Sequence, residues 1–529
     1  MKTKKTSTNN SSLDEHSYDY IVIGSGFGGS VSAMRLSEKG YRVLVLEAGK
    51  RYNNKDFPKT NWNIRKYLWI PLLRCFGIFR LTLMRHVFIL SGRGVGGGSL
   101  VYANTLLVPK DEVWEDPQWR DLHNWKEIMP RFYQTARYML GATTNKYLGN
   151  GDKMLRDIAH EFSPTAKESF YPTEVGVYFG KPDVTVPDPY FDGKGPARTG
   201  CNFCGGCMVG CPNGAKNTLD KNYLYFAEQN GATILPEMTV TAVYPTDETQ
   251  SEYIVEAVKT TRLLPFLKKK TTFHTKGVVF SGGVLGTVKL LMECKEKNHL
   301  PHLSDKLGDI IRTNSESIIG VRFNDKETPS MNDGVAIGSG IYIDDKTHIE
   351  AVRYPKGSGS LSLLCMPISG QLKNIFSKIG GYLFGVNPIN WSSQTLILLV
   401  MQPLNNHLQL VKSKMGFLNT KLPKGSDMPP VNIPLANKFA RLMASKKKGL
   451  AITTFTEIFF KIPTTAHILG GCIMGKNKEV SVIDEKNQIH GYKNLYVCDG
   501  SMISANLGVN PSLTITALTE NAMSYIPPK

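Results

Sequence analysis

The chain has 529 residues, of which 41% are hydrophobic and 20% charged, and 49 are glycine. This composition argues against a disordered chain, and the length exceeds the size at which one hydrophobic core usually stops growing, so we expect two joined globular domains. The 63 Lys and Arg against 45 Asp and Glu give a formal charge of +18, which favours contact with polyanions or with an anionic lipid surface without separating the two.

Residues 1–17 are basic and polar, with no apolar run before the first expected strand. They do not match a secretory signal, and we expect a disordered tail. The nine cysteines are an odd number and do not suit a disulfide framework in a chain of this length. We therefore expect a cytoplasmic protein.

A dinucleotide-binding motif follows the tail. The apolar strand 20–23 runs directly into Gly24-Ser25-Gly26-Phe27-Gly28-Gly29, and residues 31–38 have the composition of a helix. The first, third and sixth positions form G-x-G-x-x-G, whose glycines allow the tight turn, the close approach of a diphosphate and the packing of helix on strand. A second strand, 41–46, ends at Glu47, about twenty residues on, where an acid binds ribose hydroxyls. The motif predicts nucleotide binding but does not separate FAD from NAD.

Two further glycine-rich stretches favour FAD. One is S-G-R-G-V-G-G-G-S at 91–99, and the other is Y-V-C-D-G-S at 496–501, with G-V-N-P behind it at 508–511. A buried flavin needs access to the backbone of several loops, and glycine provides that access.

Together these runs resemble the glucose–methanol–choline (GMC) oxidoreductase superfamily, and within it the cholesterol oxidase branch. The resemblance spans nearly the whole chain in order and is weakest in the middle third. The matching runs are the Gly24 motif, G-R-G-V-G-G-G-S at 92–99, L-D-K-N-Y-L at 219–224, H-I-L-G-G-C at 467–472, Y-K-N-L-Y at 492–496 and G-V-N-P at 508–511.

The resemblance implies an α/β fold in which a discontinuous, Rossmann-like FAD-binding domain carries an inserted, sheet-based α+β substrate-binding domain. We expect FAD-binding parts at 18–150, 200–315 and 463–529, a substrate-binding domain at 316–462 and a lid at 60–90. The residues expected to bind FAD are Gly24, Gly26, Phe27, Gly28, Gly29, Glu47, Gly92, Gly97, Gly98, Ser99, Asn104, Val240, Asp499, Gly500, Asn510 and Pro511.

The resemblance also implies that the protein oxidises an alcohol. The histidine and the asparagine that serve this reaction in the family match His467 and Asn510. Imidazole can exchange the hydroxyl proton, and an amide can donate to oxygen. A glutamate that moves a steroid double bond matches Glu350. The structural alternatives are a histidine in a turn and a solvent-facing acid on a strand.

The leading substrate is a 3β-hydroxysterol, with FAD as cofactor. A long-chain fatty alcohol is the alternative within enzymes. A membrane-surface lipid-binding protein that retains flavin without turnover is the alternative of another class. We expect no nucleic-acid partner, and the sequence predicts neither the electron acceptor nor the oligomeric state.

Four cysteines fall close together. Cys201, Cys204, Cys207 and Cys211 spell C-x2-C-x2-C-x3-C-P, the spacing of a [4Fe–4S] cluster. In ferredoxins the fourth cysteine serves a second cluster, and no second run exists here, so a distant thiol such as Cys75 or Cys294 would have to complete the site. A zinc site, or thiols packed beside the flavin without metal, are the competing hypotheses. A similar insertion in flavin-only relatives favours the last of these.

Residues 67–90 form the most apolar region. Their length would span a bilayer, but Pro71, Arg74, Arg80 and Arg85 fall inside them and oppose insertion. The region is either a buried core segment or, as the resemblance implies, a lid over the substrate pocket. A lid of apolar residues with interleaved arginines predicts peripheral contact with a membrane.

Overall fold

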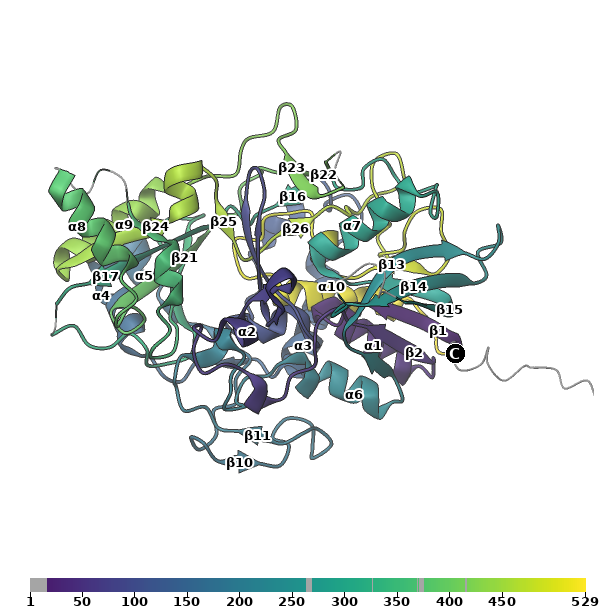
Figure 1. Ribbon diagram of the computed structural model, residues 1–529, viewed down its shortest axis with the longest axis horizontal. Helices are drawn as coiled ribbons and strands as arrows, with labels where there is room; N and C mark the ends of the chain where they lie inside the picture. Colours follow the sequence, from purple (N-terminus) through teal and green to yellow (C-terminus); the bar gives the residue numbers. More distant parts are fainter. Residues whose placement is uncertain (1–16, 263–268, 326, 369, 371–374, 414–415) are drawn as a thin grey trace, which may run out of the picture.

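The computed structural model of the protein describes residues 17–529 apart from 263–268, 326, 369, 371–374 and 414–415. Two seven-stranded sheets dominate it, one on the right of Figure 1 and one on the left, and helices pack against both. Residues 1–16 of the predicted tail lie outside the described residues, whereas Ser17 is the first residue of strand β1 (Ser17–Ile23). The predicted α/β class is confirmed.

The first sheet combines parallel strands with an antiparallel extension. It consists of β1, β2 (Val43–Leu46), β12 (Thr233–Leu235), β13 (Met238–Pro245), β14 (Tyr253–Lys259), β15 (Lys270–Phe280) and β27 (Leu495–Val497). The strand order is β12, β2, β1, β15, β14 and β13, and β27 pairs in parallel with the end of β15 beyond β14. The short parallel strand β2 reads V-L-V-L and is wholly buried, as expected where helices cover both faces of a sheet.

Helices pack around this sheet. They include α1 (Phe27–Glu38), α3 (Trp125–Leu140), α6 (Tyr223–Gln229), α7 (Gly283–Glu296) and α10 (Ser512–Ser524). Helix α1 contacts α6 and α10, α10 contacts α3, and α7 packs on β13. Nearly every residue of α10 is buried, so the start of this helix is fixed firmly inside the molecule.

The turn between β1 and α1 requires glycine. Gly24 has φ +100°, and a Cβ there would lie 2.2 Å from the carbonyl oxygen of Ser281. A Cβ at Gly28 would lie 1.8 Å from the carbonyl oxygen of Cys498. The first helix therefore approaches the chain after β15 and β27 more closely than any side chain permits.

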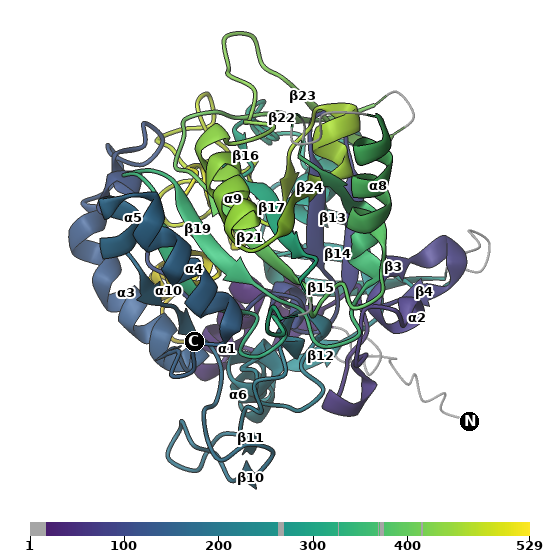
Figure 2. The same ribbon diagram turned by 90° about the vertical axis from the view of Figure 1, so that its left-hand side faces the viewer.

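The second sheet is antiparallel throughout. In spatial order its strands are β20 (Cys365–Pro367), β24 (Gly449–Thr454), β17 (Ser317–Phe323), β21 (Thr395–Met401), β19 (His348–Val352), β18 (Ile337–Tyr342) and β8 (Tyr171–Pro172). Helices α4 (Asn150–Phe162), α5 (Pro164–Glu168) and α9 (Pro434–Lys446) cover the face turned toward the viewer in Figure 2. Helix α8 (Ile375–Val386) contacts β20 and β24.

Part of this sheet comes from an earlier segment than 316–462. Strand β8 and helix α4 belong to residues 150–172, and α4 is tied to the sheet by a fully buried ion pair in which Arg353 Nη2 lies 2.7 Å from Asp152 Oδ1. The other six strands fall within 316–462. The domain limits themselves stay a prediction.

The predicted lid, 60–90, forms two hairpins. The first pairs β3 (Trp69–Ile70) with β4 (Cys75–Phe76), and the second pairs β5 (Phe79–Leu83) with β6 (Phe88–Gly92). Strand β6 also pairs in parallel with β25 (Thr464–Thr465). Within the described part of the chain, no helix is both long enough and apolar enough to cross a bilayer.

Candidate active site

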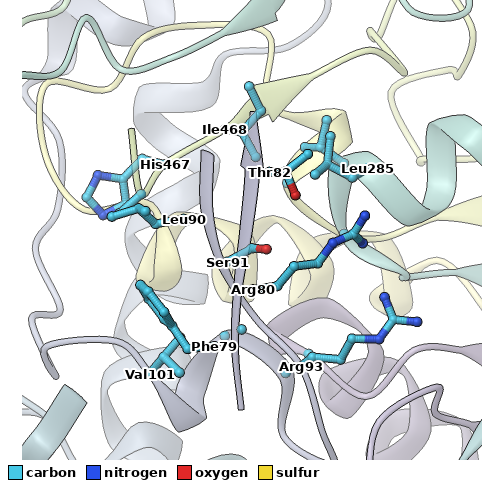
Figure 3. Close-up of a pocket in the computed structure, with 18 of the residues that line it drawn as sticks. Phe79, Arg80, Thr82, Leu90, Ser91, Arg93, Val101, Leu285, His467 and Ile468 are labelled. Carbon is cyan, nitrogen blue, oxygen red and sulfur yellow. The ribbon is translucent and has the colours of Figure 1, made fainter. Parts of the chain in front are cut away.

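A cavity of about 1080 Å³ is lined by residues of both sheets and of the β5–β6 hairpin. Small-molecule pockets commonly measure roughly 300–1,000 Å³, so this cavity is large for one and suits a bulky ligand. Figure 3 shows the hairpin crossing the site, with His467 on one side of it in this view and the guanidinium groups of Arg80 and Arg93 on the other.

The turn after β1 forms one wall of the cavity. Its lining residues are Gly24, Ser25, Gly26, Phe27 and Gly28. A Cβ at Gly26 would meet no heavy atom within 4 Å, so free space lies directly over this backbone. Glu47, which follows β2, accepts hydrogen bonds from the Ser25 N–H at 3.1 Å, the Ser25 hydroxyl at 2.7 Å and the Gly49 N–H at 2.7 Å. Its carboxylate is thereby held at the cavity wall.

The second glycine run lies against the first. Gly97 has φ +51°, and a Cβ there would come within 2.6 Å of the Gly26 Cα. The predicted cofactor residues of this run that line the cavity are Gly92, Gly97 and Gly98. Three other residues predicted to bind the cofactor do not line the cavity: Ser99, Asn104 and, from the first motif, Gly29. The Asn104 amide is buried, and neither of its polar atoms has a hydrogen-bond partner among the residues that the structure describes.

The C-terminal segments complete the enclosure. Lining residues predicted from them and from β13 are Val240, Asp499, Gly500, Asn510 and Pro511. Helix α10 begins at Ser512, which also lines the cavity, so the positive end of the α10 dipole faces the site. Glycine backbone, a fixed carboxylate and a helix N-terminus together form a wall suited to a dinucleotide.

The three predicted catalytic residues lie near one another. His467 and Asn510 line the cavity, whereas Glu350 lies behind Asn510 and accepts a hydrogen bond of 3.1 Å from its Nδ2. Glu350 is fully buried on β19, and burial raises the pKa of its carboxyl to about 7. Glu350 Oε1 and Asn510 Oδ1 have no hydrogen-bond partner in the described chain. The site thus offers an imidazole, an amide and a carboxyl that can exchange a proton near neutral pH.

Glu316, just before β17, was missed by sequence reasoning. Its Oε2 lies 2.8 Å from Nδ1 of His467, within ion-pair distance, although the ring is not aligned for a linear hydrogen bond. The two residues are 151 positions apart in the chain (467 − 316), and no motif surrounds Glu316. Its carboxylate is fully buried.

Comparison with known proteins agrees with this geometry. A family model of an NAD(P)-binding Rossmann-like domain matches residues 22–52, and two GMC oxidoreductase models match 197–324 and 434–519. A cholesterol oxidase of Acinetobacter baumannii is 46% identical over 98% of this chain and 96% of that protein. The chain belongs to the GMC oxidoreductase family. A cholesterol oxidase of Mycobacterium tuberculosis, 45% identical over 97% of this chain and 91% of that protein, places this GMC oxidoreductase in the cholesterol oxidase branch.

A solved structure shares the fold of this GMC oxidoreductase. Pyridoxine 4-oxidase from Mesorbium loti superposes with a TM-score of 0.64 at 15% sequence identity, covering 96% of this chain and 99% of that one. The predicted GMC-type fold is therefore confirmed.

This GMC oxidoreductase is an FAD-dependent enzyme that acts on CH–OH groups. The walls described above fit FAD, because the backbone at Gly26 is open and Glu47 is held where ribose hydroxyls can be recognised. When bound, FAD accepts hydride from the carbon that carries the hydroxyl. The protein supplies orientation, proton exchange and exclusion of water.

Two arginines of the hairpin region were not predicted as site residues. Arg80 and Arg93 both line the cavity, and burial together with the charge of Arg93 lowers the pKa of Arg80 to about 10. Arg93 also lies over the ring of Trp69, 4.8 Å from its centroid. The side of the cavity near Glu47 therefore carries positive charge, which suits an anionic cofactor.

The cysteine run does not form a metal centre in the described chain. No group of three Cys, His, Asp or Glu side chains there is arranged to hold a metal ion. The thiols accept from separate donors instead: the Phe203 N–H for Cys201, the Asn213 amide for Cys204 and the Ala336 N–H for Cys207, each at 3.4 Å. The structure gives no support to the iron–sulfur cluster that the spacing suggested.

A buried lysine links this cysteine-rich loop to the segment that follows the second glycine run. The Nζ of Lys216 donates to the carbonyl oxygens of Leu100 at 3.0 Å, Tyr102 at 3.1 Å and Cys207 at 2.8 Å. Burial lowers the pKa of its amine to about 7. These three hydrogen bonds fasten the loop to the segment that follows Gly98.

Proposed function

We propose that this GMC oxidoreductase oxidises the 3β-hydroxyl of a sterol and then shifts the ring double bond from the 5-ene to the 4-ene position. The part of the cavity that lies against the second sheet is mainly apolar, and some residues on and near the hairpin add to this apolar surface. Its lining residues there are Phe79, Leu90, Val101, Ile318, Ile337, Val352, Ile397 and Leu399. A rigid hydrocarbon of several rings suits such a wall better than a small polar alcohol does.

One observation carries this proposal: the carboxyl of Glu350 is fully buried, has a pKa near 7 and is held by Asn510 behind the apolar wall. Oxidation of an alcohol needs one base, and His467 can serve as that base. A second base beside it has a use only if another proton must move. A 3-keto-5-ene steroid requires such a transfer, from carbon 4 to carbon 6, whereas a fatty aldehyde does not.

The chain's residues then act in two steps. His467 accepts the hydroxyl proton as hydride leaves carbon 3, and the Asn510 amide orients the oxygen. Glu350, as the carboxylate, takes a proton from carbon 4 of the ketone and returns it to carbon 6. The double bond moves into conjugation, and the carboxylate is regenerated.

The relatives support this proposal and also define the alternative. Two cholesterol oxidases match at 45–46% identity over nearly the full chain. A long-chain-alcohol oxidase of Arabidopsis thaliana is 23% identical over 94% of this chain, which spans 65% of that protein. Long-chain primary alcohols are therefore the substrates against which sterols should be tested.

We expect cholesterol in detergent, added anaerobically to the purified enzyme, to bleach the flavin absorbance within one turnover. Dodecanol at the same concentration should do so at least about tenfold more slowly, because its flexible chain loses more entropy on binding than a rigid ring system does. The measurement is stopped-flow absorbance. Faster bleaching by dodecanol than by cholesterol would assign the enzyme to fatty alcohols.

Apolar side chains at the cavity rim support sterol delivery from a membrane. Leu83, at the tip of the β5–β6 hairpin, and Phe417 both line the cavity and are 57% and 67% exposed. Arg85 follows Leu83 within the hairpin turn. Leu72 and Leu73, on the other hairpin of the predicted lid, are also exposed but do not line the cavity. Contact with lipid at Leu83 and Phe417 would bring the cavity mouth to the sterol.

We expect the double variant Leu83→Ser, Phe417→Ser to lower turnover of cholesterol in anionic vesicles at least about fivefold more than turnover of cholesterol in detergent, because burying each side chain in lipid contributes about 1.5–3 kcal/mol. The matched control is Leu72→Ser, Leu73→Ser, which removes two leucines that are at least as exposed and do not line the cavity. Equal loss with vesicles and detergent in the first variant would contradict membrane delivery through this rim.

A further inference from the structure

The imidazole of His467 faces two carboxyl groups, one from each of two elements packed around it. Glu316 precedes β17 and lies 2.8 Å from Nδ1, while Glu350 on β19 acts on the ring from farther away. His467 itself follows the short strand β25, and its side chain is only 13% exposed. The carboxylate of Glu316 is thus its closest charged neighbour.

Glu316 is held independently of the imidazole. Its Oε1 accepts a hydrogen bond of 3.1 Å from the Ala466 N–H, and its Oε2 lies 3.0 Å from the hydroxyl of Thr465. Both donors immediately precede His467 in the chain, and the His467 N–H in turn donates to the Thr465 hydroxyl at 2.9 Å. The loop that carries the histidine therefore also fixes the carboxylate that contacts its ring.

The short contact determines where the ring carries its proton. A nitrogen lone pair and a carboxylate oxygen 2.8 Å apart would repel each other, so this contact favours a proton on Nδ1 even though the ring is not aligned for a linear hydrogen bond. The other ring nitrogen, Nε2, is then the acceptor for a hydroxyl proton. A fully buried carboxylate is also costly without a positive partner, and the imidazolium formed when Nε2 takes a proton provides that partner.

We propose that Glu316 is a positioning residue for alcohol oxidation: it keeps the proton of His467 on Nδ1, leaves Nε2 free to accept the hydroxyl proton, and stabilises the imidazolium that results. This inference rests on the proposed role of His467 as the base. It does not depend on whether the alcohol is a sterol.

The charge of Glu316 has a defined effect on pH dependence. It raises the pKa of His467 and opposes the desolvation that would lower it, and the charge of Glu350 acts in the same direction as that of Glu316. Only the neutral ring can accept a proton. The rate of alcohol oxidation should therefore rise with pH through the His467 pKa.

The first test needs neither a variant of Glu316 nor a substrate. In holoenzyme labelled with ¹⁵N-histidine, the NMR signals of His467 are those missing from the His467→Gln protein. We expect the neutral ring to carry its proton on Nδ1. A neutral ring protonated on Nε2 would overturn the proposal, whatever the substrate.

The second test uses Glu316→Gln, which keeps the size and one acceptor oxygen but removes the charge. We expect the pH at which His467 titrates by NMR to fall by about one unit or more. The pH profile of anaerobic flavin bleaching should shift in the same direction, and its plateau rate should fall about 100-fold. Glu316→Asp retains the charge, and it should restore the titration midpoint more than the rate because its carboxylate is shorter.

The matched control is Glu457→Gln, which neutralises another buried carboxyl whose hydrogen-bond partner is Thr453. It should leave the His467 titration unchanged. An equal shift in this control, or an unchanged His467 titration in Glu316→Gln, would show that Glu316 has only a structural role. The titration reports on the pair even if both cholesterol and dodecanol fail to bleach the flavin, so failure of the substrate proposal remains distinguishable.

Discussion

Replacement of His467 by alanine should slow anaerobic bleaching of the flavin by alcohol by about 10²–10⁴-fold while FAD stays bound. The histidine lines the cavity, whereas most of the dinucleotide wall is built from other segments. Loss of a positioned general base costs a rate factor of this size. The measurements are stopped-flow absorbance for the rate and the flavin spectrum of the purified variant for cofactor content.

His160→Ala is a suitable control because His160 is exposed on α4 and does not line the cavity. It should bleach at the wild-type rate. If His467→Ala bleached within a few fold of wild type, this histidine would be a structural residue and the proposed chemistry would need another base.

Glu350→Gln should separate oxidation from isomerisation. Its flavin should still bleach with cholesterol, but the unconjugated 5-ene ketone should accumulate because an amide cannot accept the carbon-4 proton. We expect isomerisation to slow by about 10²–10⁴-fold, the range for loss of a general base. Ultraviolet absorbance measures this directly, since only the conjugated ketone has the corresponding band.

The product ratio of the unmodified enzyme should depend on pH in a related way. Burial raises the pKa of Glu350 to about 7, so the carboxyl is mostly protonated below that pH and cannot act as a base. More unconjugated ketone should therefore be released at pH 6 than at pH 8, a range chosen to bracket the shifted pKa by about one unit on each side. Glu350→Gln should lose this dependence.

Glu457→Gln controls for the loss of a buried carboxyl, because burial raises the pKa of Glu457 to about 7 as well. This variant should isomerise normally. Isomerisation at the wild-type rate in Glu350→Gln would show that another group moves the proton. The bleaching experiment would still test the oxidation of the sterol, because it does not depend on Glu350.

Local sequence was sufficient for the dinucleotide end of the cavity. The turn after β1 and the start of α1 need glycine because backbone oxygens of Ser281 and Cys498 lie where side chains would be, and Glu47 needs only to follow the next strand. These requirements act over short stretches with fixed spacing, so they leave a motif. The same holds for the runs around His467 and Asn510.

The cysteine run and the apolar run 67–90 could not be interpreted fully from sequence, because their structures depend on contacts with residues far away in the chain. The cysteine spacing suggested a cluster, but each of three thiols accepts from a separate donor. The apolar run 67–90 forms two hairpins, of which the second lines the cavity through residues such as Leu83 and Leu90. The apolar composition of this run could be read from the sequence. Its pairing with β25, more than 370 residues away (464 − 92), could not.

FAD binding could be predicted from the sequence alone, because a phosphate-binding turn and its flanking strands are specified by neighbours along the chain. The run around His467 marked that histidine as the candidate base. The burial of Glu350 behind Asn510 and the contact between Glu316 and His467 became visible in the folded structure alone. Burial and charge pairing arise when β17, β19 and the C-terminal loops pack together. An isolated glutamate in a strand-like segment carries no sign of the dielectric or the partner that will set its pKa.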